Sequence, residues 1–293
     1  MQSGNNIFVF TQQDFQKCFV VNLNPPLGQG HDARVYLAMH KKTGEMFALK
    51  KSPGLITIYL ANEIQILKCI DHAGTVLLKG YAQDYTCVLL EYMPNDTFLK
   101  VLKKGPFQLS FAKTLASYLT RVLVTLHAAS IAHCDIKPEN ILIAADYNLK
   151  LCDFGFARIC KEPLRPPGGT PGYTAPEMYI NPQVNLFKCD VFALGVVLFI
   201  VVMGFPPFQT NDPNVKDGWW GLIQSKQFDL FWSKCEQFKQ QQLPQEFKNL
   251  IMSMLECDPE KRISLQQVLE HEFLMNGAPE EEVLQEIETR VKE

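Results

Sequence analysis

The chain has 293 residues, and its 28 Lys and Arg against 31 Asp and Glu give a formal net charge of -3. With 47% hydrophobic and 20% charged residues, its composition is that of a globular protein and excludes a disordered or fibrous chain. The near-neutral charge provides no basic surface for nucleic acid or an anionic membrane, so we expect neither as a partner.

The first quarter of the chain shows mostly strand periodicity. Apolar and polar side chains alternate on both sides of a turn at 41–44, which predicts a β-hairpin. We predict one helix in this region, at 59–70, with its apolar side chains on one face. The predicted strands lie at 34–39, 47–50, 76–81 and 87–92.

After Pro94 the apolar periodicity becomes helical. Ser110 is a candidate N-cap for a long helix, and further helices are predicted at 191–203, 245–256 and 265–270. The sequence therefore predicts an α+β fold, with a β-rich first part, a helix-rich remainder and a hinge near 91–95.

Two glycines, Gly28 and Gly30, precede the hairpin. A dinucleotide-binding turn would need a third glycine and a following helix, whereas this chain continues with Ala33 and a strand. In isolation such glycines most often form a plain turn, but a glycine-rich hairpin can also lie over phosphates, because no side chain blocks its N–H groups.

Lys50 lies on the returning strand of this hairpin. Glu63, on the predicted helix, is the only acidic residue between Lys50 and Asp71. A strand lysine is usually a solvated edge charge, but a helix glutamate can orient it by a charge-assisted hydrogen bond and let it bind phosphates.

Three further motifs follow in order: His133-Cys134-Asp135-Ile136-Lys137-Pro138-Glu139-Asn140, Asp153-Phe154-Gly155 and Ala175-Pro176-Glu177. Together with the glycines, Lys50 and Glu63, they resemble the protein kinase family over about residues 19–274. The resemblance implies a bilobal fold. Its expected parts are an N-terminal extension at 1–18, a small β-rich N-lobe with one helix at 19–93, a mainly helical C-lobe at 94–274 and a C-terminal amphipathic helix at 275–293.

The resemblance also implies catalytic roles. Asp135 would orient the substrate hydroxyl and accept its proton, Lys137 would neutralise the migrating phosphoryl group, and Thr170 would hydrogen-bond both. Asn140 and Asp153 would supply oxygen ligands to Mg2+.

The ATP site implied by the resemblance lies around Lys50, which Glu63 would hold against the α- and β-phosphates. Leu90 would be the gatekeeper at the back of the adenine pocket. Further nucleotide-binding residues would be Leu27, Gly28, Gly30, Val35, Ala48, Glu91, Met93 and Leu142.

Lys137-Pro138-Glu139 and Gly169-Thr170-Pro171 resemble serine/threonine kinases, and the segment 203–208 resembles the calmodulin-dependent or cyclic-nucleotide-dependent branches. The implied reaction is transfer of the γ-phosphoryl group of ATP to Ser or Thr of protein substrates in signalling. A pseudokinase scaffold is the alternative; retention of the polar catalytic residues argues against it. A small-molecule kinase is disfavoured by the Ala175-Pro176-Glu177 segment.

Cys134 departs from the family, which usually has an arginine there to bind a phosphate on the activation loop. No Ser, Thr or Tyr lies between Phe154 and Thr170, and two prolines occupy the stretch where a phosphosite is usual. The sequence therefore predicts activity without activation-loop phosphorylation.

Nine cysteines without a C-x-x-C pair predict neither a disulfide framework nor a zinc site. The N-terminus has no secretory signal pattern, and the apolar run at 191–205 is shorter than the roughly 20 residues that span a bilayer, so we interpret it as a buried helix. We expect a cytoplasmic monomer. The acidic C-terminal helix is expected to pack on its own domain, with a docking role left open.

Overall fold

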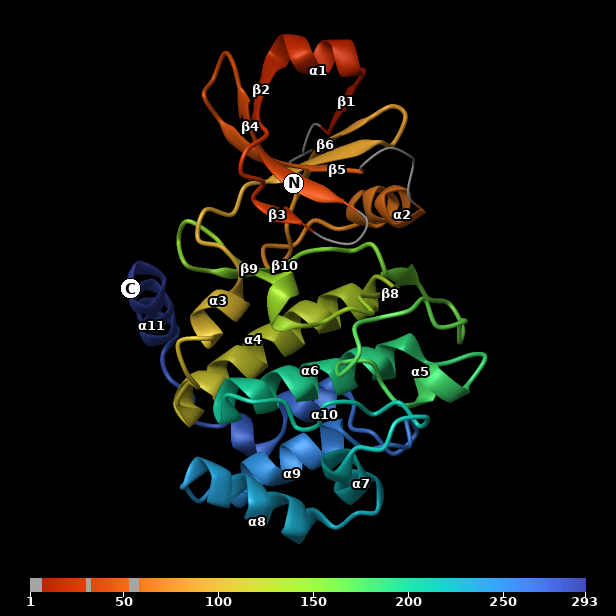
Figure 1. The fold of residues 1–293 in the computed structure, drawn as a ribbon, viewed down its shortest axis with the longest axis vertical. Helices are drawn as coiled ribbons and strands as arrows, with labels where there is room; N and C mark the ends of the chain where they lie inside the picture. The colour runs from red at the N-terminus through yellow and green to blue at the C-terminus, as the bar shows by residue number, and fades with distance from the viewer. Residues whose placement is uncertain (1–6, 30–32, 53–57) are drawn as a thin grey trace. The chain divides into compact units, whose positions relative to one another are not determined.

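The computed structural model describes residues 7–29, 33–52 and 58–293. The chain forms two compact units. The first comprises Met1–Asp96 and Leu142–Ala157, and the second comprises Thr97–Ile141 and Arg158–Glu293 (Figure 1). The segment Leu142–Ala157, predicted as part of the C-lobe, thus belongs to the first unit.

Among the described residues, seven strands of the first unit form one sheet in the order β1-β6-β7-β5-β4-β2, with β3 paired to β4 (Figure 1). The pairing is antiparallel except between β1 and β6, which run parallel. The predicted β4–β5 hairpin is confirmed. The strands are β1 (Phe8–Phe10), β2 (Phe19–Asn22), β3 (Gly28–Gln29), β4 (Arg34–His40), β5 (Met46–Lys51), β6 (Leu78–Ala82) and β7 (Cys87–Glu91).

The two faces of this sheet differ in composition. The register sets Val35 opposite Lys50 and Ala48 opposite Leu90, and since side chains alternate along a strand, these four share one face. The other face carries a buried apolar cluster formed by Phe10, Phe15, Phe19, Ala38, Phe47, Leu49, Ala82 and Leu89.

Helix α1 (Gln12–Cys18) covers this apolar face, and Thr11 caps it by accepting a hydrogen bond from the Asp14 N–H at 3.2 Å. Its buried side chain, Phe15, packs between Phe10 and Phe19, with ring centroids at 4.9 and 4.6 Å. Helix α1 lies within residues 1–18, which are predicted as an extension outside an N-lobe with one helix. A seven-residue helix with a single buried side chain leaves too weak a periodicity to predict.

We expect Phe15→Ala to lower the free energy of unfolding by about 3 kcal/mol, because it removes the ring that joins α1 to the sheet. Urea denaturation measures this change. Phe8→Ala, on a side chain that is 51% exposed on the neighbouring strand, should change it by less than about 0.5 kcal/mol. Equal effects of the two substitutions would show that α1 is not part of the core.

Helix α2 (Ile58–Leu67) contacts β6 and β7 and buries Leu60, Ile64 and Leu67, which were predicted to share a face. The predicted end at residue 70 is three residues too late. Strands β9 (Ile141–Ile143) and β10 (Leu149–Leu151) pair with one another, and β10 leads directly to Asp153.

The second unit is mainly helical (Figure 1). Its central helix α6 is apolar on all sides, begins after the Asn185 cap and ends at Gly204, whose φ of 79° suits a left-handed cap. By length and composition α6 could cross a membrane, but 83% of its apolar window is buried inside the structure, as expected for a core helix. The helices are α3 (Phe98–Leu102), α4 (Leu109–Ala128), η1 (Pro138–Asn140), α5 (Glu177–Ile180), α6 (Leu186–Met203), α7 (Gly218–Gln224), α8 (Phe228–Lys239), α9 (Gln245–Met254), α10 (Leu265–Leu269), η2 (Glu272–Leu274) and α11 (Glu280–Lys292).

The C-terminal helix α11 packs on α3 and α4, as predicted. Val283 and Ile287 are buried, and the Arg290 guanidinium lies 3.6 Å from the centroid of the Phe107 ring. Arg290 also donates to the carbonyl oxygen of Gly105 at 2.7 Å. A cation–π contact and a hydrogen bond thus fix the end of the helix to its own unit.

Candidate active site

Lys50, on β5, is the centre of the polar cluster in the first unit. Its Nζ lies 2.7 Å from Glu63 Oε2 and 2.8 Å from Asp153 Oδ1. The predicted Lys50–Glu63 pair is confirmed. Burial alone would lower the pKa of Lys50, but the two carboxylates outweigh it and raise that pKa above its usual value, so the ammonium remains charged.

Asp153 follows β10 in the left-handed backbone region, with φ of 61°. A non-glycine residue in this region is uncommon and needs support from its surroundings. Glu63 provides part of it, since its second oxygen, Oε1, accepts a hydrogen bond from the Phe154 N–H at 3.2 Å. The Asp153 side chain remains 42% exposed.

The predicted nucleotide residues of the first unit lie around this cluster. Leu27 donates its N–H to the Val35 carbonyl at 2.8 Å, and Gly28 pairs with Val35 between β3 and β4. Gly30 lies outside the described residues. Ala48 and Leu142 are half-buried on β5 and β9, whereas the predicted gatekeeper, Leu90, is buried at 7% exposure. Next to the charged Lys50, the sheet therefore offers apolar side chains suited to a flat aromatic ring.

Glu91 is more constrained than the sequence indicated. Its N–H donates to the Leu77 carbonyl at 3.0 Å, so its contact with an adenine would have to come from its own carbonyl. Its side chain accepts from Lys150 Nζ at 2.6 Å and from the Leu77 N–H at 3.2 Å. The N–H of Met93, by contrast, has no hydrogen-bond partner among the described residues.

The predicted catalytic residues of the second unit form a compact network around Asp135, whose side chain is almost fully buried. Asp135 Oδ2 accepts hydrogen bonds from Lys137 Nζ and Asn140 Nδ2, both at 2.8 Å. Its Oδ1 accepts one from the Thr170 hydroxyl at 2.7 Å, and Lys137 donates to that hydroxyl at 2.6 Å. The predicted contacts of Thr170 are confirmed.

Asp190, on α6, holds the backbone of this loop. Its carboxylate accepts from the N–H groups of His133 and Cys134, each at 2.8 Å, and from His127 Nε2 at 2.9 Å. Asp190 therefore anchors the backbone that leads into Asp135. Cys134 has a left-handed φ of 65°, and burial raises the pKa of its thiol well above the ordinary value, so the group is uncharged.

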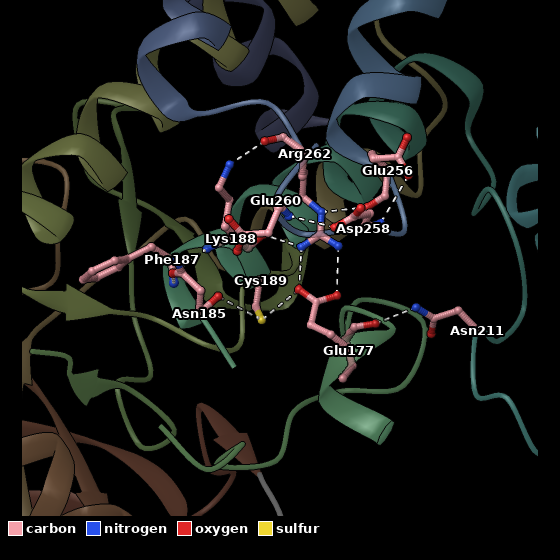
Figure 2. Close-up of polar contacts among 11 residues, drawn as sticks. Glu177, Asn185, Phe187, Lys188, Cys189, Asn211, Glu256, Asp258, Glu260 and Arg262 are labelled. Carbon is pink, nitrogen blue, oxygen red and sulfur yellow. Dashed lines mark hydrogen bonds and ion pairs between the residues drawn. The ribbon is translucent and has the colours of Figure 1, made fainter. Parts of the chain in front are cut away.

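A buried ion pair in the second unit joins Glu177 and Arg262. Figure 2 shows the two side chains facing one another, with N–O distances of 2.6 and 2.9 Å. Arg262 also donates to the carbonyl oxygens of Lys188 and Glu256 at 2.8 and 2.9 Å. Each charged group is thus compensated by several hydrogen bonds.

We expect Arg262→Ala to lower the free energy of unfolding by about 3–5 kcal/mol, because it leaves the Glu177 carboxylate buried without a counter-ion. Urea denaturation would measure the loss. Lys261→Ala is a matched control, since it removes the neighbouring cation, whose side chain is 70% exposed and pairs with Asp258. Little change is expected there, and a similar loss in both variants would contradict the importance of the buried pair.

The predicted site residues thus form two groups, each inside one unit. Those of the first unit are Leu27, Gly28, Val35, Ala48, Lys50, Glu63, Leu90, Glu91, Met93, Leu142 and Asp153; those of the second are Asp135, Lys137, Asn140 and Thr170.

The protein kinase domain family matches residues 21–274, so the chain belongs to this family, and its two units are the β-rich N-lobe and helical C-lobe of the kinase fold. It is 31% identical to the serine/threonine-protein kinase DCLK3 of Mus musculus over 85% of this chain and 32% of that protein. It is also 33% identical to a probable myosin light chain kinase of Dictyostelium discoideum over 87% of this chain and 54% of that protein. The chain therefore spans about a third to a half of the length of these relatives.

Proposed function

We propose that this chain is an ATP- and Mg2+-dependent serine/threonine protein kinase, which transfers the γ-phosphoryl group of ATP to Ser or Thr of protein substrates. The observation that carries the proposal is the network in which Lys137, Asn140 and Thr170 all bind the carboxylate of Asp135. The relatives named above, which are called serine/threonine or myosin light chain kinases, support the same class.

Asp135 is the group that orients the substrate hydroxyl and takes its proton. Hydrogen bonds to both carboxylate oxygens fix its orientation before substrate arrives, which lowers the entropy lost in reaching the reactive geometry. Lys137 places a positive charge beside it, where a transferred phosphoryl group would need neutralisation.

Lys50 is the group that binds the α- and β-phosphates. It is held by two carboxylates and remains charged, so it can attract phosphate oxygens without first being ordered. The apolar side chains of Val35, Ala48 and Leu142 suit contact with the adenine ring.

Asn140 and Asp153 suit Mg2+ by the chemistry of their donor atoms, since this ion prefers oxygen ligands. Asn140 donates its Nδ2 hydrogens to Asp135, so its amide oxygen is the atom left to bind the metal. The Asp153 carboxylate is 42% exposed. When bound, Mg2+ supplies positive charge to the phosphate oxygens.

We expect Asp135→Asn to reduce phosphate incorporation into a generic basic protein by about 10²–10⁴-fold, because an amide cannot accept the hydroxyl proton. Transfer from γ-labelled ATP in the presence of Mg2+ measures it. Asp229→Asn, on the exposed side of α8, is the matched control and should retain full activity. Equal incorporation by wild type and Asp135→Asn would favour the pseudokinase alternative.

We further propose that activity needs no phosphate on the activation loop. Cys134 is uncharged and buried where many relatives have the phosphate-binding arginine, and 155–169 contains no phosphorylatable side chain. Backbone hydrogen bonds support the loop instead. Strand β11 (Arg158–Ile159) pairs with β8 (Ile131–Ala132), and Leu164 and Val184 exchange two bonds at 2.9 and 3.1 Å.

Treatment with a protein phosphatase should therefore leave the turnover number within about twofold of the untreated protein, because the loop contacts involve no phosphate. Steady-state kinetics on the two samples, with mass spectrometry of the loop, tests this. A fall in the turnover number of tenfold or more in the phosphatase-treated sample, restored when the protein is phosphorylated again, would refute it.

A further inference from the structure

Asn62 lies on α2 directly before Glu63 and is not one of the residues assigned to the proposed reaction. Its Nδ2 donates to the carbonyl oxygens of Ala157 at 2.9 Å, Gly155 at 3.0 Å and Phe154 at 3.3 Å. All three acceptors belong to the backbone segment that follows Asp153. One side chain of α2 thus binds nearly the whole turn after the predicted metal ligand.

The identity of the neighbours explains why this side chain is an amide. Three carbonyl oxygens lie within hydrogen-bond distance of its Nδ2, and an amide NH2 group supplies N–H donors to them without placing an acceptor atom against them. Aspartate at this position has the same shape but would set carboxylate oxygens against carbonyl oxygens. The site therefore favours the neutral amide over a carboxylate of the same shape, which carries a negative charge and has no N–H donor.

Two further contacts come from the same helix. Glu63 Oε1 accepts from the Phe154 N–H, and the ring of Tyr59 lies 5.0 Å from that of Phe156. Residues three and four positions apart lie on one helix face, so Tyr59, Asn62 and Glu63 form a continuous contact surface. A Cβ added at Gly155 would lie 3.4 Å from Tyr59 Cβ, so the segment lies close against this surface.

The segment needs such support because Asp153 has a left-handed φ of 61°. That conformation persists in a non-glycine residue only where neighbouring contacts hold it. Here it is the conformation in which Asp153 Oδ1 lies 2.8 Å from Lys50 Nζ.

We propose that Asn62 is a positioning residue that holds 154–157 against α2 and so keeps the Asp153 carboxylate directed at Lys50. This inference rests on the proposed function insofar as Asp153 serves catalysis. Glu63 binds an N–H group and Asn62 binds C=O groups of the same turn, so α2 and the turn hold one another in place. None of these contacts needs a phosphate on the activation loop.

The test uses Asn62→Asp and Asn62→Ala in the full chain, with Gln65→Glu as control. Gln65 is an exposed amide on the same helix, and among the described residues its side chain makes one hydrogen bond, to the Tyr85 hydroxyl at 3.4 Å. Gln65→Glu therefore makes the same amide-to-carboxylate change away from the turn. Hydrogen exchange of peptides covering 153–157 is the readout independent of activity. We expect exchange about tenfold faster in both Asn62 variants, corresponding to the loss of one to two hydrogen bonds, and unchanged exchange in Gln65→Glu.

Steady-state kinetics provide the second readout. We expect the Mg2+ concentration for half-maximal activity to rise, and kcat to fall, by about tenfold in Asn62→Asp, because the Asp153 carboxylate is in place less of the time. The KM for a peptide substrate should be unchanged, since Asn62 touches no group assigned to that substrate. A general loss of stability would instead raise exchange throughout the first unit.

The proposal is overturned if exchange at 153–157 and the Mg2+ dependence of both Asn62 variants match those of Gln65→Glu. It is also overturned if the faster exchange spreads evenly over the first unit. If the wild-type chain transfers no phosphate, the proposed function fails, and the exchange comparison alone decides whether Asn62 holds the turn.

Discussion

The first unit depends on a lysine whose charge is retained in a partly buried place. Burial would lower the pKa of an isolated ammonium there, but Lys50 lies within 2.8 Å of two carboxylates that come from α2 and from the turn after β10. Glu63 also accepts the Phe154 N–H, so the glutamate that holds the lysine also holds the backbone beside the other carboxylate. The ion pair thus makes strand, helix and turn parts of one arrangement.

In the second unit, as in the first, a buried carboxylate supports a backbone turn with a left-handed residue. Cys134 and Asp153 both have left-handed backbone angles, with φ of 65° and 61°. In each case a buried carboxylate accepts a hydrogen bond from a nearby backbone N–H. Asp190 binds the N–H of Cys134 itself, and Glu63 binds the N–H that follows Asp153. A charged acceptor makes a stronger hydrogen bond than a carbonyl does, and it can offset the strain of such a backbone. Both turns then hold a functional side chain in one orientation.

Sequence motifs predicted these groups well, because each key side chain occurs in a short pattern with a physical role. Lys50, Glu63, Asp135 and Thr170 could all be named, and their predicted contacts are present. The contacts that were missed join distant parts of the chain without a pattern. The Glu91–Lys150 bond spans 59 residues, and Asn62 contacts carbonyl groups 92 to 95 residues away. A main-chain acceptor leaves no trace in the identity of its residue, so a side chain that binds only carbonyl groups cannot be predicted from pairs of residue types. The packing of α1 was missed for a different reason, since one buried ring gives no periodicity.

The uncharged Cys134, in place of the arginine usual in the family, affects how the activation loop can be ordered. An arginine at this position could bind a phosphate on the activation loop, and the loop would then be ordered only after phosphorylation. If the chain is active without a phosphate on this loop, as we propose, the segment after Asp153 must be held by contacts that are always present. In the N-lobe these come from the Asn62 amide and Glu63, and in the C-lobe from the backbone pairing of β11 with β8 and of Leu164 with Val184. Such contacts are formed on folding rather than by a signal. A kinase domain built in this way would have its catalytic groups ordered as soon as it folds, and a signal that lowered its activity would have to break contacts rather than withhold a phosphate.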